Sequence, residues 1–148
     1  MKISKKVTGI TLAVILAIAL SLVISACGSA GEIEQGLIND AKALVGEAKT
    51  ELSKVEGEIA KIETQLEEEM HAVAVEARSA LERAEAAIKN ETQKGIDDAK
   101  DEIAVLKAEI TKLLEKSERL EGEAADEFHK VVKSLESKVK DLENTLKR

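Results

Sequence analysis

Few side chains in the 148-residue sequence could do chemistry, and the two histidines come first. Glu68 lies three residues before His71, and Asp126 lies three residues before His129. On a helix this spacing places a carboxylate and an imidazole on one face, as in the carboxylate-bridged di-metal sites of helical bundles. In a two-helix hairpin turning near residue 93, however, the two pairs would lie roughly 20 Å apart along the axis. We therefore expect both histidines on the surface and predict no metal or other cofactor.

Other catalytic and binding patterns are missing from the sequence. It has no Ser/His/Asp arrangement and no phosphate-binding glycine loop, and the run Glu67–Glu69 lacks the alternating ligands and turn glycine of a calcium loop. With no Trp, no Tyr and one Phe, it offers little to line a small-molecule pocket. A net charge of −7 argues against nucleic-acid binding. We predict that the protein is not an enzyme and takes neither a small-molecule substrate nor nucleic acid.

Cys27, the only cysteine, ends an apolar N-terminal segment. Residues 1–6 carry three lysines, and residues 7–26 contain no charged side chain. A basic start, an apolar stretch and small residues before a cleavage position are typical of a secretory signal peptide. The lysines hold the N-terminus on the cytoplasmic side, so the rest of the chain is exported. Twenty uncharged residues in a helix also span about 30 Å, so an uncleaved membrane anchor is the alternative.

The residues around this cysteine, Ile24-Ser25-Ala26-Cys27, resemble the lipobox of prokaryotic lipoprotein signal peptides: an aliphatic residue, a small residue, Ala or Gly, then Cys. The resemblance implies cleavage after Ala26, a diacylglycerol thioether on Cys27 and a lipidated N-terminus with fatty acyl chains such as palmitate. It implies attachment to a prokaryotic cell membrane, facing the periplasmic or extracellular side. In a diderm bacterium Gly28, where inner-membrane lipoproteins carry Asp, implies the outer membrane.

The remaining sequence has the composition of long helices. We divide the chain into a signal peptide (1–26), the lipidated cysteine with a flexible tether (27–31) and a helical domain (32–148). Residues 32–148 contain no proline and are rich in Ala, Glu, Lys and Leu, which favour helices. We predict an all-α fold of long amphipathic helices, because apolar residues recur at intervals of three and four. Examples are Leu52, Val55, Ile59, Ile62 and Leu66, then Phe128, Val132, Leu135, Val139, Leu142 and Leu146.

Charged residues fill the positions between the apolar ones, and many lie four apart with the acid first. This is the favourable orientation for an ion pair on a helix surface. We predict such pairs on solvated helix faces, where each is worth only a few tenths of a kcal/mol. The pairs are Glu85–Lys89, Glu115–Arg119, Asp126–Lys130, Glu136–Lys140 and Glu143–Lys147.

One polar stretch interrupts the apolar pattern and predicts a turn near residues 90–95. Lys89–Gly95 contains no apolar residue, and Gly95 suits the left-handed conformation of a helix C-terminal cap. Asp97 and Asp98 suit the start of the next helix. A second, weaker turn candidate is Lys116–Gly122. The sequence therefore favours a coiled-coil-like antiparallel hairpin with arms of roughly 80 to 90 Å, or a small bundle, and a single long rod is the alternative.

A two-helix hairpin with one aromatic residue buries little area, so we expect self-association or a protein partner. Together these features predict a lipid-anchored exported protein that acts as a structural spacer, tether or adaptor at the cell envelope. The alternative is an amphipathic-helix module that binds lipid or another ligand. The plan resembles that of the murein lipoproteins, which join the cell wall through a C-terminal Lys. Here Lys147 is next to last and Arg148 is the terminal residue, which departs from that pattern, and the sequence does not decide whether Lys147 is linked to the wall.

Overall fold

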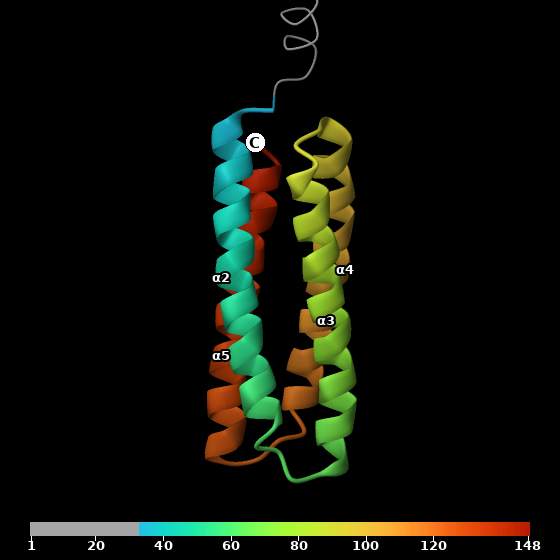
Figure 1. Cartoon of the computed structure of the whole chain (residues 1–148). Helices are drawn as coiled ribbons and strands as arrows, with labels where there is room; N and C mark the ends of the chain where they lie inside the picture. Colours follow the sequence, from blue (N-terminus) through green and yellow to red (C-terminus); the bar gives the residue numbers. More distant parts are fainter. Residues whose placement is uncertain (1–32) are drawn as a thin grey trace, which may run out of the picture. The chain divides into compact units, whose positions relative to one another are not determined.

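The computed structural model describes residues 33–148, which fold into four α-helices and their connections. These are α2 (Gln35–Ile59), α3 (Gln65–Lys89), α4 (Gln93–Ser117) and α5 (Glu123–Leu146). They run alternately up and down (Figure 1). α2 packs against α3 and α5, and α4 packs against the same two helices, so the bundle closes on itself. The predicted all-α small bundle is confirmed.

The helices are much shorter than a two-arm hairpin would make them. Each has 24 or 25 residues, which corresponds to about 37 Å. The 80 to 90 Å hairpin and the single rod are therefore wrong. Ile33 and Arg148 lie at one end of the bundle, and the connections at residues 60–64 and 118–122 lie at the other (Figure 1). We expected self-association because a two-helix hairpin would bury only a small core. The four helices instead bury a larger core within one chain.

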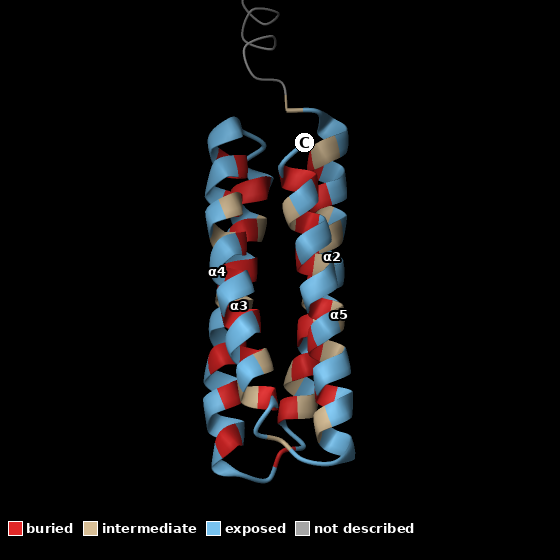
Figure 2. Ribbon diagram, turned by 180° about the vertical axis from the view of Figure 1, so that it is seen from behind, coloured by how far each residue is buried: buried red, intermediate tan, exposed pale blue. Residues whose placement is uncertain are grey.

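The apolar stripes form a single core along the bundle axis. The buried residues lie along the inner faces of all four helices (Figure 2) and form one cluster. Phe128, the only Phe, is 1% exposed, and the predicted stripe residues around it on α5 are buried. Half of the buried side chains of α3 are alanines, and the backbones of α3 and α4 approach each other along more of their length than those of α2 and α3. The buried alanines of α3 are Ala74, Ala77, Ala80, Ala84 and Ala87.

The turn between α2 and α3 was not predicted from the apolar pattern. Ile59, Ile62 and Leu66 are all buried, so the interval of three and four continues through the connection and hides it. The polar residues do mark the turn. The Thr64 side chain accepts a hydrogen bond from the Leu66 amide at 3.3 Å and so caps α3. Thr64 and Glu67 have the spacing of a capping box, which is the sequence signal for this helix start.

The predicted turn near residues 90–95 is present, but Gly95 has a different role in it. Glu91 adopts the positive φ of 51°, whereas Gly95 lies inside the first turn of α4. Its amide donates to the Thr92 hydroxyl at 3.0 Å. A Cβ at this position would lie 2.4 Å from the carbonyl oxygen of Ala87. Glycine is therefore required because α4 begins in close contact with the last turn of α3.

The weaker turn candidate, Lys116–Gly122, is also confirmed. α4 ends at Ser117 and α5 begins at Glu123. The Ser117 hydroxyl donates to the carbonyl of Leu114 at 2.6 Å, which satisfies one backbone group of the last helical turn. Gly122 has φ of +77°, a conformation that favours glycine. This connection returns α5 to α2.

Candidate functional site

The predicted lipidation motif, Ile24, Ser25, Ala26 and Cys27, lies outside the described residues. The bundle begins at Ile33, only six residues after Cys27. A stretch of that length spans about 20 Å when fully extended. Among the helices of residues 33–148, none has both the length and the apolar character needed to cross a membrane.

The two Glu/Asp-x-x-His motifs do not come together. His71 and His129 each lie six residues after the first residue of α3 and α5, respectively, and both side chains are exposed. Our separation of 20 Å along the axis is wrong, because both lie near the same end of a bundle and not in a hairpin. α3 and α5 instead occupy diagonal corners and do not pack on each other. In residues 33–148 no three His, Cys, Asp or Glu side chains gather as a metal site would require.

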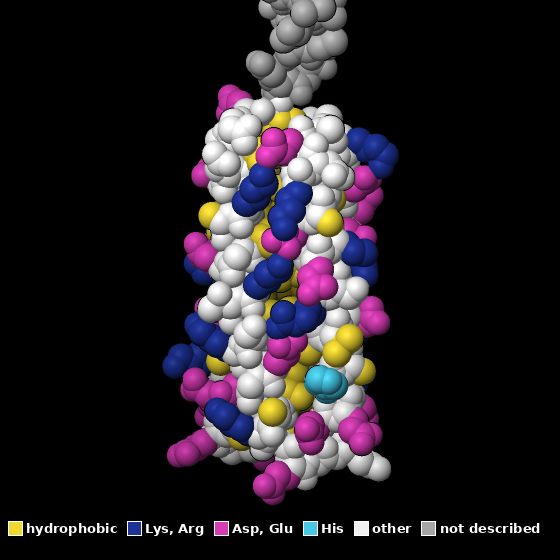
Figure 3. All heavy atoms as spheres, in the orientation of Figure 1, with side chains coloured by type: hydrophobic (Ala, Val, Ile, Leu, Met, Phe, Trp, Pro, Cys, Tyr) yellow, Lys and Arg dark blue, Asp and Glu magenta, His cyan; other side chains and the backbone are white. Residues whose placement is uncertain are grey.

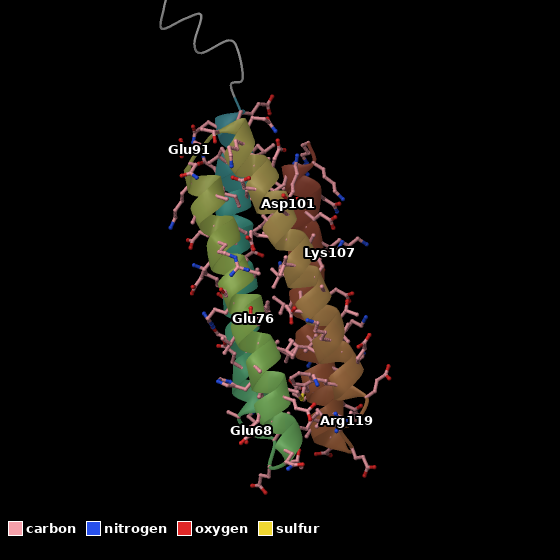
Figure 4. The ribbon with its side chains drawn as sticks, turned by 90° about the vertical axis from the view of Figure 1, so that its right-hand side faces the viewer. Glu68, Glu76, Glu91, Asp101, Lys107 and Arg119 are labelled. Carbon is pink, nitrogen blue, oxygen red and sulfur yellow. The ribbon has the colours of Figure 1, made fainter. Side chains whose placement is uncertain are left out.

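The acidic run Glu67–Glu69 contributes to helix packing through its last residue. Glu69 Oε2 accepts hydrogen bonds from Lys116 Nζ at 2.7 Å and from Arg119 Nη1 at 3.2 Å. The hydrogen bond from Lys116, with its charge and that of Arg119, lowers the pKa of Glu69. Figure 4 shows Glu68 and Arg119 at the end of the bundle opposite Glu91. Glu69 therefore joins α3 to the last turn of α4.

Ion pairs cross the seam between α2 and α3, which are farther apart than α3 and α4. In Figure 3 basic and acidic side chains alternate down this seam, with apolar side chains visible between them. The structure gives three cross-seam pairs here: Lys42–Glu91 at 2.6 Å, Lys49–Glu85 at 2.5 Å and Arg78–Glu56 at 2.5 Å. Hydrogen bonds from Lys49 and then Lys89 lower the pKa of Glu85. On the α2–α3 face, the basic side chains of these three pairs are therefore neutralised by carboxylates from across the seam.

The opposite seam, between α4 and α5, holds a groove of about 690 Å³. One ion pair crosses it, from Lys107 Nζ on α4 to Glu143 Oε2 on α5 at 2.7 Å. Lys107 lies at the border of the two helices in Figure 4. Lys147 also contacts Glu143, at 2.6 Å. The hydrogen bonds from Lys107 and Lys147 lower the pKa of Glu143 to about 2. The groove is lined by Lys107, Ile110, Thr111, Lys133, Glu136, Ser137, Lys140, Glu143, Asn144 and Lys147.

Lys140, in this groove, is the only lysine of residues 33–148 that has no carboxylate oxygen of these same residues within 4.0 Å. The predicted pair Glu136–Lys140 is wrong, because Glu136 contacts Lys133 at 3.0 Å instead. Both lysines are helix neighbours of Glu136, so either contact was possible. The choice leaves the ammonium of Lys140 without a partner carboxylate.

Of the other four predicted pairs, two form and two do not. Glu85–Lys89 and Glu143–Lys147 form, at 3.1 and 2.6 Å. Glu115–Arg119 and Asp126–Lys130 do not, because Arg119 reaches Glu69 on α3 and Lys130 lies beside Glu127. Cross-helix partners compete with partners on the same helix, and the sequence alone does not rank them.

Sequence reasoning did not find the groove, although one signal for it is present. Lys133, Lys140 and Lys147 are seven residues apart, which places them on one face of α5. The spacing of four residues from an acid assigned Lys140 and Lys147 to local ion pairs, and this interpretation concealed the row that they form with Lys133. The contribution of α4 to the groove could not be predicted without knowing which helices are neighbours.

Comparison with known proteins places the chain in no family. No family model matches the sequence, and no curated protein or solved structure matches it significantly.

Proposed function

We propose that this protein is exported, anchored to a prokaryotic membrane through lipid on Cys27, and acts there as a structural tether, spacer or adaptor without enzymatic activity. The motif Ile24-Ser25-Ala26-Cys27 at the end of an uncharged segment carries the proposal. The segment after it supports the proposal because residues 33–148 have a core of their own and need no packing against the anchor. Two or three acyl chains give stable membrane attachment, which a single chain does not.

The dimensions of the bundle favour an adaptor over a long spacer. Its helices extend about 37 Å from the Ile33 end, less than half of a long two-helix hairpin. The connections at residues 60–64 and 118–122 form the end farthest from Ile33. A partner bound at that end would therefore lie about 37 Å from the Ile33 end of the bundle. The protein would face the periplasmic or extracellular side, on the outer membrane in a diderm.

The alternative of an amphipathic-helix module that coats a lipid surface is less well supported. The apolar faces of all four helices are buried against one another. Binding a lipid surface through these faces would require the bundle to open and its core to be exposed. Val75 and Val105 are the large apolar side chains that stay exposed among the described residues, and they lie on different helices.

The proposed anchor can be tested by labelling the full-length protein with radioactive palmitate in a bacterial host. We expect the wild type to take up label and to sediment with membranes. Cys27→Ala should take up no label and should accumulate as a larger, uncleaved precursor. Ser25→Ala is the matched control, because alanine is also small and should leave labelling intact. An unlabelled wild type that keeps residues 1–26 would overturn the proposal.

A further inference from the structure

The α4–α5 groove is built differently from the α2–α3 seam on the opposite side of the bundle. On the α2–α3 seam each basic side chain of the three cross-seam pairs is bound by a carboxylate from across the seam, on the facing helix for Lys49 and Arg78 and in the α3–α4 connection for Lys42. In the groove one such pair, Lys107–Glu143, crosses between the helices. The floor includes the buried side chain of Ile110, and lysines stand along the α5 wall. The groove is thus an open cavity with a basic wall on an otherwise acidic protein.

The charges of the groove do not cancel. Its lining holds four lysines and two glutamates, which leaves two positive charges. Glu136 is taken by Lys133, and Glu143 is shared between Lys107 and Lys147. One positive charge therefore belongs to the trio around Glu143 and the other to Lys140. An anion entering the groove would meet these charges without first displacing a carboxylate from Lys140.

Neutral donors lie beside Lys140 on the same face of α5. Ser137 is three residues before it and Asn144 four residues after it, and both line the groove. A serine hydroxyl and an asparagine amide can donate to oxygens that an ammonium group leaves unsatisfied. The hydroxyl of Thr111, across the groove, is already used, because it donates to the carbonyl of Lys107 at 3.1 Å. Available donors thus gather around Lys140.

We propose that this groove binds a small anionic ligand that carries phosphate groups, and that Lys140 is the central side chain that contacts it. Phosphate suits the arrangement because it accepts several hydrogen bonds and because lysine binds it as a point charge. The row from Lys133 to Lys147 extends about 21 Å along α5, so there is room for more than one phosphate group. The phosphate could belong to a free phosphate compound or to the headgroup of an anionic phospholipid. This binding activity is independent of the proposed anchoring function.

Calorimetric titration of the full-length protein, in an uncharged detergent at physiological ionic strength, tests the proposal with two probes. Inorganic pyrophosphate represents free phosphate compounds, and glycerophosphoglycerol represents the headgroup of phosphatidylglycerol. The variant is Lys140→Gln, which removes a charge that no ion pair uses. The matched control is Lys130→Gln on the same helix, because Lys130 is outside the groove and its ammonium lies 3.8 Å from Glu127. Circular dichroism checks that each variant is folded.

We expect saturable binding of at least one probe, weakened at least tenfold in Lys140→Gln and changed less than twofold in Lys130→Gln. Binding of pyrophosphate alone would assign the groove to free phosphate compounds, and binding of glycerophosphoglycerol would assign it to a lipid headgroup. If neither probe binds saturably, the proposal is wrong. It is also wrong if both variants lose affinity equally, since the effect would then be one of overall charge.

Discussion

Arg78 of α3 holds the carboxylate of Glu56 on α2 through two hydrogen bonds, from Nε to Oε1 at 2.7 Å and from Nη2 to Oε2 at 2.5 Å. This pairing depends on the turn that the apolar pattern concealed. In one continuous helix the two residues, 22 positions apart, would be separated by roughly 33 Å. Their contact therefore exists only in the four-helix arrangement. The hydrogen bonds that Arg78 donates to Glu56 raise the pKa of its guanidinium.

The first prediction concerns the energy of this pair. Both side chains are about one third exposed, so we expect a coupling free energy of about 0.5 to 1 kcal/mol between Glu56→Gln and Arg78→Gln. Urea denaturation of the two single variants and the double variant would measure it. Glu58→Gln is the control, because Glu58 contacts Lys61 nearby in sequence and not Arg78. A coupling of zero would show that the pair does not hold α2 and α3 together.

The second prediction uses the glycines, which differ in their surroundings. Gly57 lies inside α2 with open space where a Cβ would be, so Gly57→Ala should raise the free energy of unfolding by up to about 1 kcal/mol. Gly122→Ala should lower it, because Gly122 has φ of +77°. Gly95→Ala should also lower it, through the collision with the Ala87 carbonyl. Thermal unfolding, monitored by circular dichroism, would rank the three variants by stability. Equal effects of the three substitutions would contradict the roles assigned to these glycines.

The third prediction concerns acid stability. The pKa of Glu143 is lowered from 4.5 to about 2 by Lys107 and Lys147, so the folded state favours the ionised carboxylate. The stabilisation is complete above the unfolded-state pKa near 4.5 and is lost as the pH falls toward 2. Between those values the unfolding temperature of Glu143→Gln should fall less steeply than that of the wild type. Parallel curves for the two proteins would show that Glu143 contributes nothing to acid sensitivity.

Much of the fold could be predicted from local sequence, and the exceptions have physical causes. The stripe that includes Leu135 and Val139 predicted buried helix faces correctly, because burial of one face sets the spacing of apolar residues. The connection at residues 60–64 was missed because Ile62 stays buried within it and keeps the same spacing. The number of helices, and with it the length of the bundle, depended on that connection together with the weaker candidate at 118–122.

The candidate sites differ in how far sequence could predict them. Cys27 was identified from a local motif, which needs no tertiary structure, and its lipidation remains a prediction. The groove depends on the contact between α4 and α5, and Lys140 stands out only because Glu136 selects Lys133. Where several charged partners compete, the neighbouring helix decides which ion pair forms, as when Arg119 pairs with Glu69 on α3. Which helices are neighbours was not known from the sequence.

The central claim, that Cys27 carries the anchor, is tested most directly by mass spectrometry of the N-terminal peptide of the protein purified from membranes. We predict a mature chain that begins at Cys27 and carries the added mass of a diacylglycerol group on its sulfur. An N-terminal peptide that still contains Ala26 joined to an unmodified Cys27 would contradict the claim.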